Sequence, residues 1–240
     1  MATWIVHLRL AENLLELIPN LDVGQFTIGN IAPDSGIPDK DWETFDPPPN
    51  VTHFLSPERE WVGSADLAFY RKYLEGISPQ RDTARFSFRL GYFSHLLTDN
   101  LWRKNIYHPF RERYAEKIDA DPKFVSKMKK DWYGLDLVYV RDHPECIFWR
   151  VFLDAEPDAC DLEFLPIKAV NQQLSYIKNF YKEYEKEINE FYFPPYIYLT
   201  QKEVDKFVDQ TTQRLHRVYQ ALWIDKIPIA DEKSILTIIQ

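Results

Sequence analysis

Apolar side chains recur every three or four residues in each long segment of this chain, and that spacing is the period of an α-helix. The first such pattern contains Trp4, Leu8, Ala11, Leu15 and Ile18, and a proline ends it. Further helices are predicted over residues 64–76, 82–105, 123–140, 162–191 and 201–223. The sequence therefore predicts an all-α fold.

One multi-helix domain covering residues 1–240 is expected, because no internal repeat or low-complexity linker divides the chain. Asp82 and Thr200 are candidate N-caps that start two of its helices. The alternation typical of a strand appears only in ILTII, at residues 235–239. A chain of this length buries a large core without disulfides, and the sequence leaves the bonding of Cys146 and Cys160 open.

Charge and hydropathy exclude several classes of function. The net charge of -8 argues against a broad nucleic-acid-binding surface, so a nucleic-acid partner is not expected. No apolar run approaches the roughly 18 residues that a membrane span requires. The start of the chain lacks the basic region of a signal peptide, which favours a cytoplasmic location.

Residues 22–57 differ in character from the rest, since they contain three glycines and six prolines. Such a composition excludes long regular structure. Long segments of this kind are usually functional when they belong to a compact domain. We expect this segment to be ordered and to fold against the predicted helix at 82–105.

That helix carries His95 and Asp99 four residues apart, in line with the small residues Ser87 and Gly91. Taken alone, the pair is also compatible with His95 hydrogen-bonding Asp99 inside an ordinary core. It is not alone. Further candidates stand in the short apolar or glycine-proline contexts TWIVHL, GNIAPD and VTHF, and these are His7, Asp34 and His53.

Buried polar residues need partners, and this set of nitrogen and oxygen donors is the set that Zn²⁺ prefers. The candidates are numerous enough for two metal ions that share a bridging carboxylate. Scattered core histidines remain the alternative from composition alone.

The motifs GNIAPDSG, THF and GYFSHLLTDNLW, with a Thr-x-x-x-His near the start, resemble the zinc-dependent phospholipase C family. That family includes secreted bacterial phospholipases C and, more distantly, single-strand-specific zinc nucleases. The likeness covers residues 4–102, ahead of the long amphipathic helices in 162–223. It implies an all-α fold with a zinc cleft, whose ligands here would be His7, Asp34, His53, His95 and Asp99, with Asp99 as the bridge.

The chain also departs from the family pattern. The secreted enzymes use an N-terminal tryptophan as a ligand, whereas Trp4 is internal here. The later ligands of a third zinc site have no counterpart, because His108 and His143 both precede proline and have the character of loop or surface residues. Two zinc ions are therefore expected, with manganese or iron as alternatives.

Asp131 is a reserve metal ligand, since it lies in an apolar-aromatic helix about where the missing ligands would fall. For both Asp131 and Asp136 the alternative is a helix-surface charge or a partner of Lys129 or Arg141. His216 lies between basic residues of the last long helix and is expected to be structural or exposed.

The expected function is a metal-dependent hydrolase, a phosphoesterase in which metal-activated water attacks a small-molecule or lipid-derived phosphoester. Asp34 is the candidate catalytic residue that orients or deprotonates this water. The alternatives are a zinc nuclease and a non-enzymatic helical binding or scaffold protein that retains the metal site. The sequence leaves open whether the long C-terminal helices form a homodimer.

Overall fold

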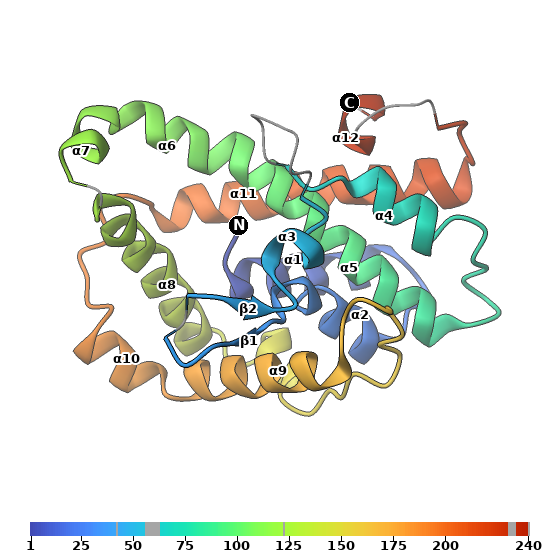
Figure 1. The fold of residues 1–240 in the computed structure, drawn as a ribbon, viewed down its shortest axis with the longest axis horizontal. Coiled ribbons are helices and arrows are strands. Elements are labelled where there is room, and N and C mark those ends of the chain that lie inside the picture. Colours follow the sequence, from blue (N-terminus) through green and yellow to red (C-terminus); the bar gives the residue numbers. More distant parts are fainter. Residues whose placement is uncertain (42, 56–62, 122, 230–233, 240) are drawn as a thin grey trace.

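The structure is a computed structural model that describes residues 1–41, 43–55, 63–121, 123–229 and 234–239. Helices dominate this part of the chain, which confirms the all-α prediction (Figure 1). Its two strands have two residues each and form one hairpin, in which β1 (Ile37–Pro38) pairs antiparallel with β2 (Phe45–Asp46). Cys146 and Cys160 are both free.

The α-helices run in chain order as α1 (Trp4–Leu17), α2 (Val23–Gly29), α3 (Pro49–Thr52), α4 (Asp66–Tyr73), α5 (Thr83–Trp102), α6 (His108–Arg113), α7 (Ala115–Ala120), α8 (Phe124–Asp142), α9 (Ile167–Lys182), α10 (Tyr184–Glu190), α11 (Gln201–Tyr219) and α12 (Ile235–Ile238). Short π-helical turns follow α5 and α11 and occupy residues 148–152, and a 3₁₀ turn covers Ala32–Asp34.

Several predicted boundaries are confirmed and others are wrong. Asp82 caps α5 by accepting a hydrogen bond from the backbone N–H of Arg85, and Thr200 forms a capping box with Glu203 at the start of α11. The pattern over 162–191 begins later than predicted, at Ile167 after Pro166, and it divides at Glu183 into α9 and α10.

The strand expected at 235–239 is also wrong, because residues 235–238 form α12. The Ser234 side chain accepts a hydrogen bond from the backbone of Leu236, and buried Asp66 accepts one from the backbone of Ile235. A capped start therefore decides the local structure of an apolar segment that has no partner strand among the described residues.

The segment 22–57 contains a short helix, α2, that its composition did not predict. Asp22 caps this helix by accepting a hydrogen bond from the backbone N–H of Gln25. The rest of the segment is irregular as expected, apart from the 3₁₀ turn, the β1–β2 hairpin and the single turn of α3. Residues 42, 56 and 57 lie outside the described part.

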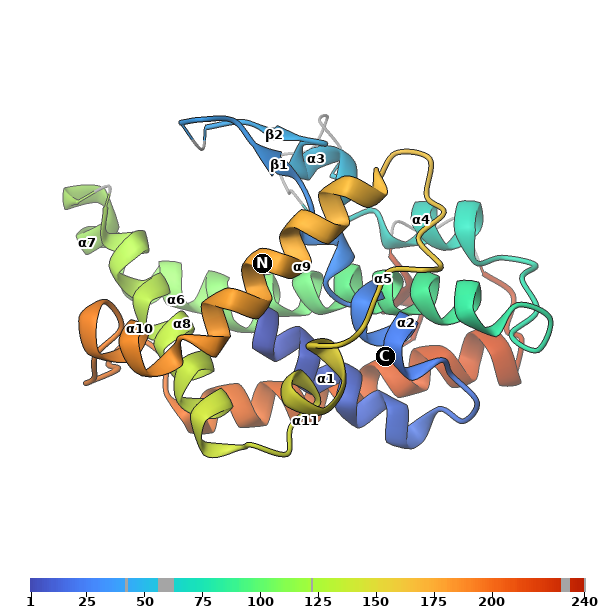
Figure 2. The ribbon, with the colours of Figure 1, turned by 90° about the horizontal axis from the view of Figure 1, so that it is seen from below.

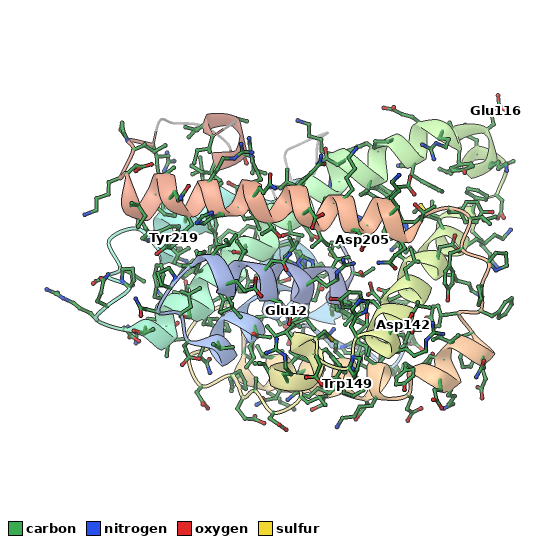
Figure 3. The ribbon with its side chains drawn as sticks, turned by 180° about the vertical axis from the view of Figure 1, so that it is seen from behind. Glu12, Glu116, Asp142, Trp149, Asp205 and Tyr219 are labelled. Carbon is green, nitrogen blue, oxygen red and sulfur yellow. The ribbon has the colours of Figure 1, made fainter. Side chains whose placement is uncertain are left out.

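The first helix, α1, lies along α11 on the back of the molecule (Figure 3). Arg9 donates a hydrogen bond to Asp205 at 2.7 Å, and Asn13 donates one to Thr212 at 3.1 Å. The other side of α1 contacts α2, α5 and α8. This central place brings His7 into the interior of the domain.

Asp136 of α8 fixes the start of α1. Its carboxylate accepts hydrogen bonds from the Thr3 hydroxyl at 2.7 Å, the Ile5 backbone at 3.4 Å and the Tyr181 hydroxyl at 2.7 Å. The side chain is buried, and burial raises the pKa of Asp136 to about 7 in spite of these donors. Asp136 is therefore a cap for α1 supplied by another helix, and the surface interpretation is wrong.

A close crossing of α2 over α5 depends on two glycines. A Cβ atom on Gly29 would overlap the carbonyl oxygen of Phe88, and a Cβ atom on Gly91 would overlap that of Phe26. Ser87 supports the same contact by accepting a hydrogen bond from the backbone of Asp22 at 2.8 Å. The small residues on α5 therefore give room to α2.

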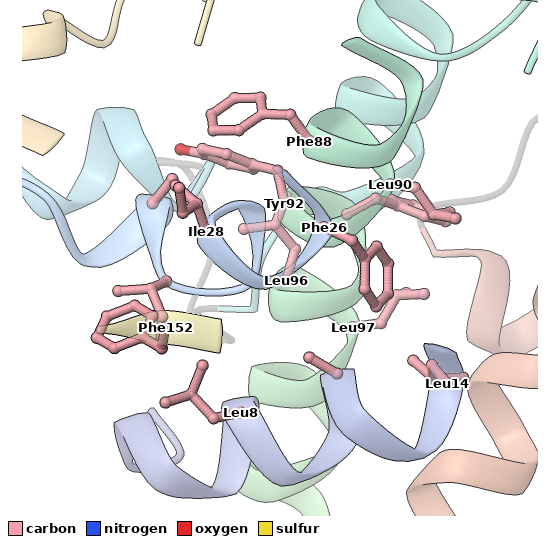
Figure 4. Close-up of a cluster of buried hydrophobic side chains, with 14 of the residues drawn as sticks. Leu8, Leu14, Phe26, Ile28, Phe88, Leu90, Tyr92, Leu96, Leu97 and Phe152 are labelled. Carbon is pink, nitrogen blue, oxygen red and sulfur yellow. The ribbon is translucent and has the colours of Figure 1, made fainter. Parts of the chain in front are cut away.

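Apolar side chains from both helices pack around this crossing (Figure 4). Phe26 and Ile28 of α2 and Leu96 and Leu97 of α5 are almost completely buried in one core cluster. The crossing also sets the distance between α5 and the segment that follows α2, because helix axes held this close leave little freedom to shift.

We predict that Gly91→Ala lowers the free energy of unfolding by about 1–3 kcal/mol, because the methyl group forces the two backbones apart. The matched control is Gly24→Ala in α2, where an added Cβ meets its nearest atom at an ordinary 3.6 Å. That control should be neutral or stabilising by up to about 1 kcal/mol. Urea denaturation of both variants measures the difference, and equal effects would contradict the close-crossing argument.

Candidate metal centre

All five side chains from the predicted ligand motifs meet in one cluster, which is largely excluded from solvent. His7 comes from α1, His95 and Asp99 come from α5, Asp34 ends the 3₁₀ turn, and His53 follows α3. His7 and His95 are 0% exposed, and the side chain of Asp34 is 8% exposed. The segment 22–57 thus folds against α5 and brings its two candidates to the other three.

The donor atoms lie within a few ångströms of one another. His53 Nε2 is 3.2 Å from Asp34 Oδ1 and 3.3 Å from His95 Nε2. Asp99 Oδ2 is 3.6 Å from His95 Nε2 and 3.7 Å from His53 Nε2, while Asp99 Oδ1 is 3.5 Å from His7 Nε2. The rings of His7 and His95 stack with centroids 3.8 Å apart.

Backbone carbonyls orient two of the imidazoles. His95 Nδ1 lies 2.8 Å from the carbonyl oxygen of Asn30, and His53 Nδ1 lies 3.2 Å from that of Pro49. A carbonyl only accepts, so Nδ1 of His95 carries a hydrogen, and Nδ1 of His53 is held between the Pro49 carbonyl and the Thr52 hydroxyl, which lies at 3.0 Å. The Nε2 atoms of both rings face the cluster, where a ring that has lost its second proton offers a lone pair to a metal ion. Histidines that ligate metals are held in this way.

His7 has neither ring nitrogen in a hydrogen bond, although the side chain is completely buried. Burial lowers the pKa of His7 to about 4, and the charge of neighbouring His95 acts in the same direction. The imidazole is therefore neutral at pH 7, which is the form that binds metals. Orphaned buried polar atoms are uncommon, and a cation in the cluster would satisfy this one.

The carboxylates of the cluster are ionised. Burial opposes ionisation of Asp99, but the amino terminus, His7 and His95 lower its pKa well below the usual value. Burial likewise opposes ionisation of Asp34, and His53 and His95 lower its pKa below the usual value. Two buried negative charges beside the neutral imidazole of His7 make an environment that favours divalent cations.

The ligand atoms form two groups, each within 4.8 Å: His7, His95 and Asp99, and Asp34, His53 and His95. His95 belongs to both groups, but its single free lone pair serves one ion only. Asp99 has two oxygens, and these face different histidines. The bridging role of Asp99 stays a prediction, with which this arrangement of its two oxygens is compatible.

The structure does not bring Asp131 to this cluster. Its Oδ2 atom accepts hydrogen bonds from the backbone N–H groups of Ile197 and Tyr198, both at 2.6 Å. The carboxylate thus holds the chain between α10 and α11 against α8, and it belongs to neither group of candidate ligand atoms. His143 is exposed and stacks on Tyr139, and His216 is partly exposed on α11.

The residues that support the ligands were not predicted. Asn30 and Pro49 act through their carbonyls, which any residue type possesses, so no side-chain pattern reveals them. The backbone N–H of Ala2 donates to Asp99 Oδ1 at 2.7 Å, again through the main chain. Tyr92 donates to the carbonyl of Thr52 and so supports the turn that carries His53.

A cavity of about 290 Å³ opens beside the cluster, and Asp34 and His53 form part of its wall. Aromatic side chains from four parts of the chain line it, namely Trp4, Phe45, Trp132, Tyr133 and Tyr176. The β1–β2 hairpin and α3 lie on the side of the molecule that also carries α9 (Figure 2). The candidate ligands therefore adjoin a space in which a small molecule fits.

A profile of the protein family described as zinc dependent phospholipase C matches residues 6–191, which is more than half of the chain. The chain belongs to this family. No curated protein and no solved structure gave a match. The family assignment and the buried His and Asp cluster together identify a zinc-binding hydrolase of phosphoric ester bonds, rather than a non-enzymatic scaffold.

The family includes enzymes that act on lipids, and none of the described helices is both long enough and apolar enough to span a bilayer.

We predict that Asp99→Asn lowers bound zinc from about two equivalents to one or fewer, because the substitution keeps the shape and removes the charge shared by both ions. Metal content of protein purified without chelator or metal-affinity tag is measured by mass spectrometry. Two controls accompany it, Asp131→Asn and His216→Ala, and both should bind as much zinc as the unmodified chain. Full zinc in Asp99→Asn would contradict the bridging role.

Proposed function

We propose that the cluster binds two zinc ions that share Asp99, and that the chain uses them to hydrolyse a phosphoester held in the adjoining cavity. The observation that carries this proposal is His7, a completely buried histidine whose nitrogens have no hydrogen-bond partner beside an ionised carboxylate. His7 and Asp99 Oδ1 would hold one ion, and Asp34, His53 and Asp99 Oδ2 the other. His95 supplies its Nε2 to either.

Hydrolysis forms a bond from a water oxygen to phosphorus and breaks the bond from phosphorus to the alcohol oxygen, which gains a proton. Zinc supplies Lewis-acid chemistry, since it lowers the pKa of water and stabilises charge on a phosphoryl oxygen. Asp34 is ionised and lies in the cavity wall, with Oδ1 directed toward His53. The second oxygen of Asp34 is then available to orient the water and to take its proton.

The cavity restricts the substrate to a small molecule or the head of a larger one. Its volume of about 290 Å³ accepts a phosphoester headgroup, and its aromatic walls accept an apolar portion. A small-molecule or lipid-derived phosphoester is the substrate class that this supports. The acidic balance of the chain, with a net charge of -8, favours such substrates over nucleic acids.

The test is hydrolysis of bis(p-nitrophenyl) phosphate and of a short-chain phospholipid by protein stripped with chelator and then reloaded with zinc. We expect activity only after reloading, and we expect Asp34→Asn to lower kcat by roughly 10²- to 10⁴-fold. Zinc content measured on the same samples separates lost metal from lost catalysis. A variant far from the cluster, His216→Ala, should match the unmodified chain.

Single-stranded DNA is included as a competing substrate. Faster cleavage of DNA than of either small phosphoester would favour the nuclease alternative. Absence of hydrolysis of every phosphoester by protein carrying its full zinc would overturn the proposed function.

A further inference from the structure

Lys129 is an exposed cation in the lining of the cavity. Among the described residues that form this lining, it is the only lysine or arginine, and Asp34 at the metal end is the only carboxylate. The chain as a whole is acidic. Lys129 therefore contributes a positive side-chain charge to the cavity wall, in addition to the amino terminus at Met1, although the molecule as a whole is acidic.

The path of α8 shows where that charge lies. Asp136 contacts Thr3 and Ile5, near the cluster, and Tyr133 contacts Trp4 with ring centroids 5.7 Å apart. Lys129 precedes Tyr133 by four residues, which is one helical turn or about 6 Å along the axis. Lys129 thus stands on the part of α8 that is farther from Asp136, and its exposure to solvent places it at the open side of the cavity.

The neighbouring acidic groups leave this lysine available. Lys127 pairs with Asp121 at 2.7 Å, whereas Lys129 has no ion-pair partner within the described residues. The other polar group of the wall near α9 is Gln173, which is neutral. Apart from Asp34 at the metal end, the described lining holds no carboxylate, so the charge of Lys129 is open to an anionic ligand.

We propose that the substrate is a phosphoester whose alcohol portion carries a negative charge, and that Lys129 determines this specificity. The proposal rests on the proposed function, because it assumes that the scissile phosphorus lies at the metal cluster. With the phosphorus there, the alcohol portion extends toward the mouth and meets the ammonium group. The substrate class is thus a phosphodiester with an anionic headgroup.

The aromatic walls of the cavity favour a different substrate, one with a cationic headgroup. Trp4, Trp132 and Tyr133 offer ring faces of the kind that bind a quaternary ammonium group. A choline-type headgroup would, however, meet the positive charge of Lys129 and would find no carboxylate among the described residues at the mouth. The charge of Lys129 therefore opposes the cationic headgroup and favours the anionic one.

The experiment uses three p-nitrophenyl phosphodiesters that differ in the charge of the second alcohol. These alcohols are 3-hydroxypropionate, which is anionic, 3,3-dimethylbutanol, which is the uncharged isostere of choline, and choline itself. For the zinc-loaded chain at low salt, kcat/KM should fall in that order, by roughly 3- to 10-fold for each step. The differences should shrink as salt is added, because the mouth of the cavity is open to solvent.

Lys129→Glu should invert the order and change the ratio of anionic to choline substrate by roughly tenfold or more. The matched control is Lys130→Glu, which makes the same change of charge at the next exposed position of α8 but outside the cavity lining. That control should leave the order unchanged. A preference of the unmodified chain for choline, or equal effects of the two variants, would overturn the inference.

Binding is measured separately from turnover, so that a wrong inference about Lys129 can be told apart from a wrong proposed function. The nitrophenyl group quenches tryptophan fluorescence, and Trp4 and Trp132 both line the cavity. Titration of zinc-free protein with the same compounds gives dissociation constants whether or not they are hydrolysed. The same order of affinity without hydrolysis would support the role of Lys129 and reject the hydrolase, whereas hydrolysis without any dependence on headgroup charge would do the reverse.

Discussion

Two ionised carboxylates and three histidines share one buried cluster, and the rest of the structure depends on how the free-energy cost of burying these charges is offset. Taking an ionised carboxylate out of water costs several kcal/mol unless a partner offsets it. Around Asp99 the described protein partners are imidazoles and one backbone N–H group. A divalent cation offsets the cost more completely, because it interacts with both carboxylates and can bind the Nε2 atom of His7.

The supports of the cluster are spread over the whole fold. Asp136 of α8 fixes the start of α1 and thereby the position of His7. The crossing of α2 over α5 at Gly29 and Gly91 places the carbonyl of Asn30 against His95. The packing of the helices therefore sets the ligand geometry. Helices hold side chains more precisely than an irregular segment such as 22–57 does by itself.

The sequence predicted the helical class and the cluster because both have strong local signals. Helical periodicity is repeated in every long segment, and the H-x-x-x-D pair lies on one face of α5. The helix α2 was missed because seven residues with two glycines give too little periodicity. Asp131 resembled a ligand by type and position, but its carboxylate binds the backbone of Ile197 and Tyr198, which lie 66 and 67 residues further along the chain. Such tertiary partners, like the cavity wall around Lys129, arise only from the packing of distant segments.

The most direct test of the central claim is an anomalous difference map at the zinc absorption edge, from crystals grown with zinc. The account predicts two peaks inside the cluster, with Asp99 contacting both, His7 contacting one and Asp34 with His53 contacting the other. An empty cluster, or zinc bound only at the surface or at Asp131, would contradict it.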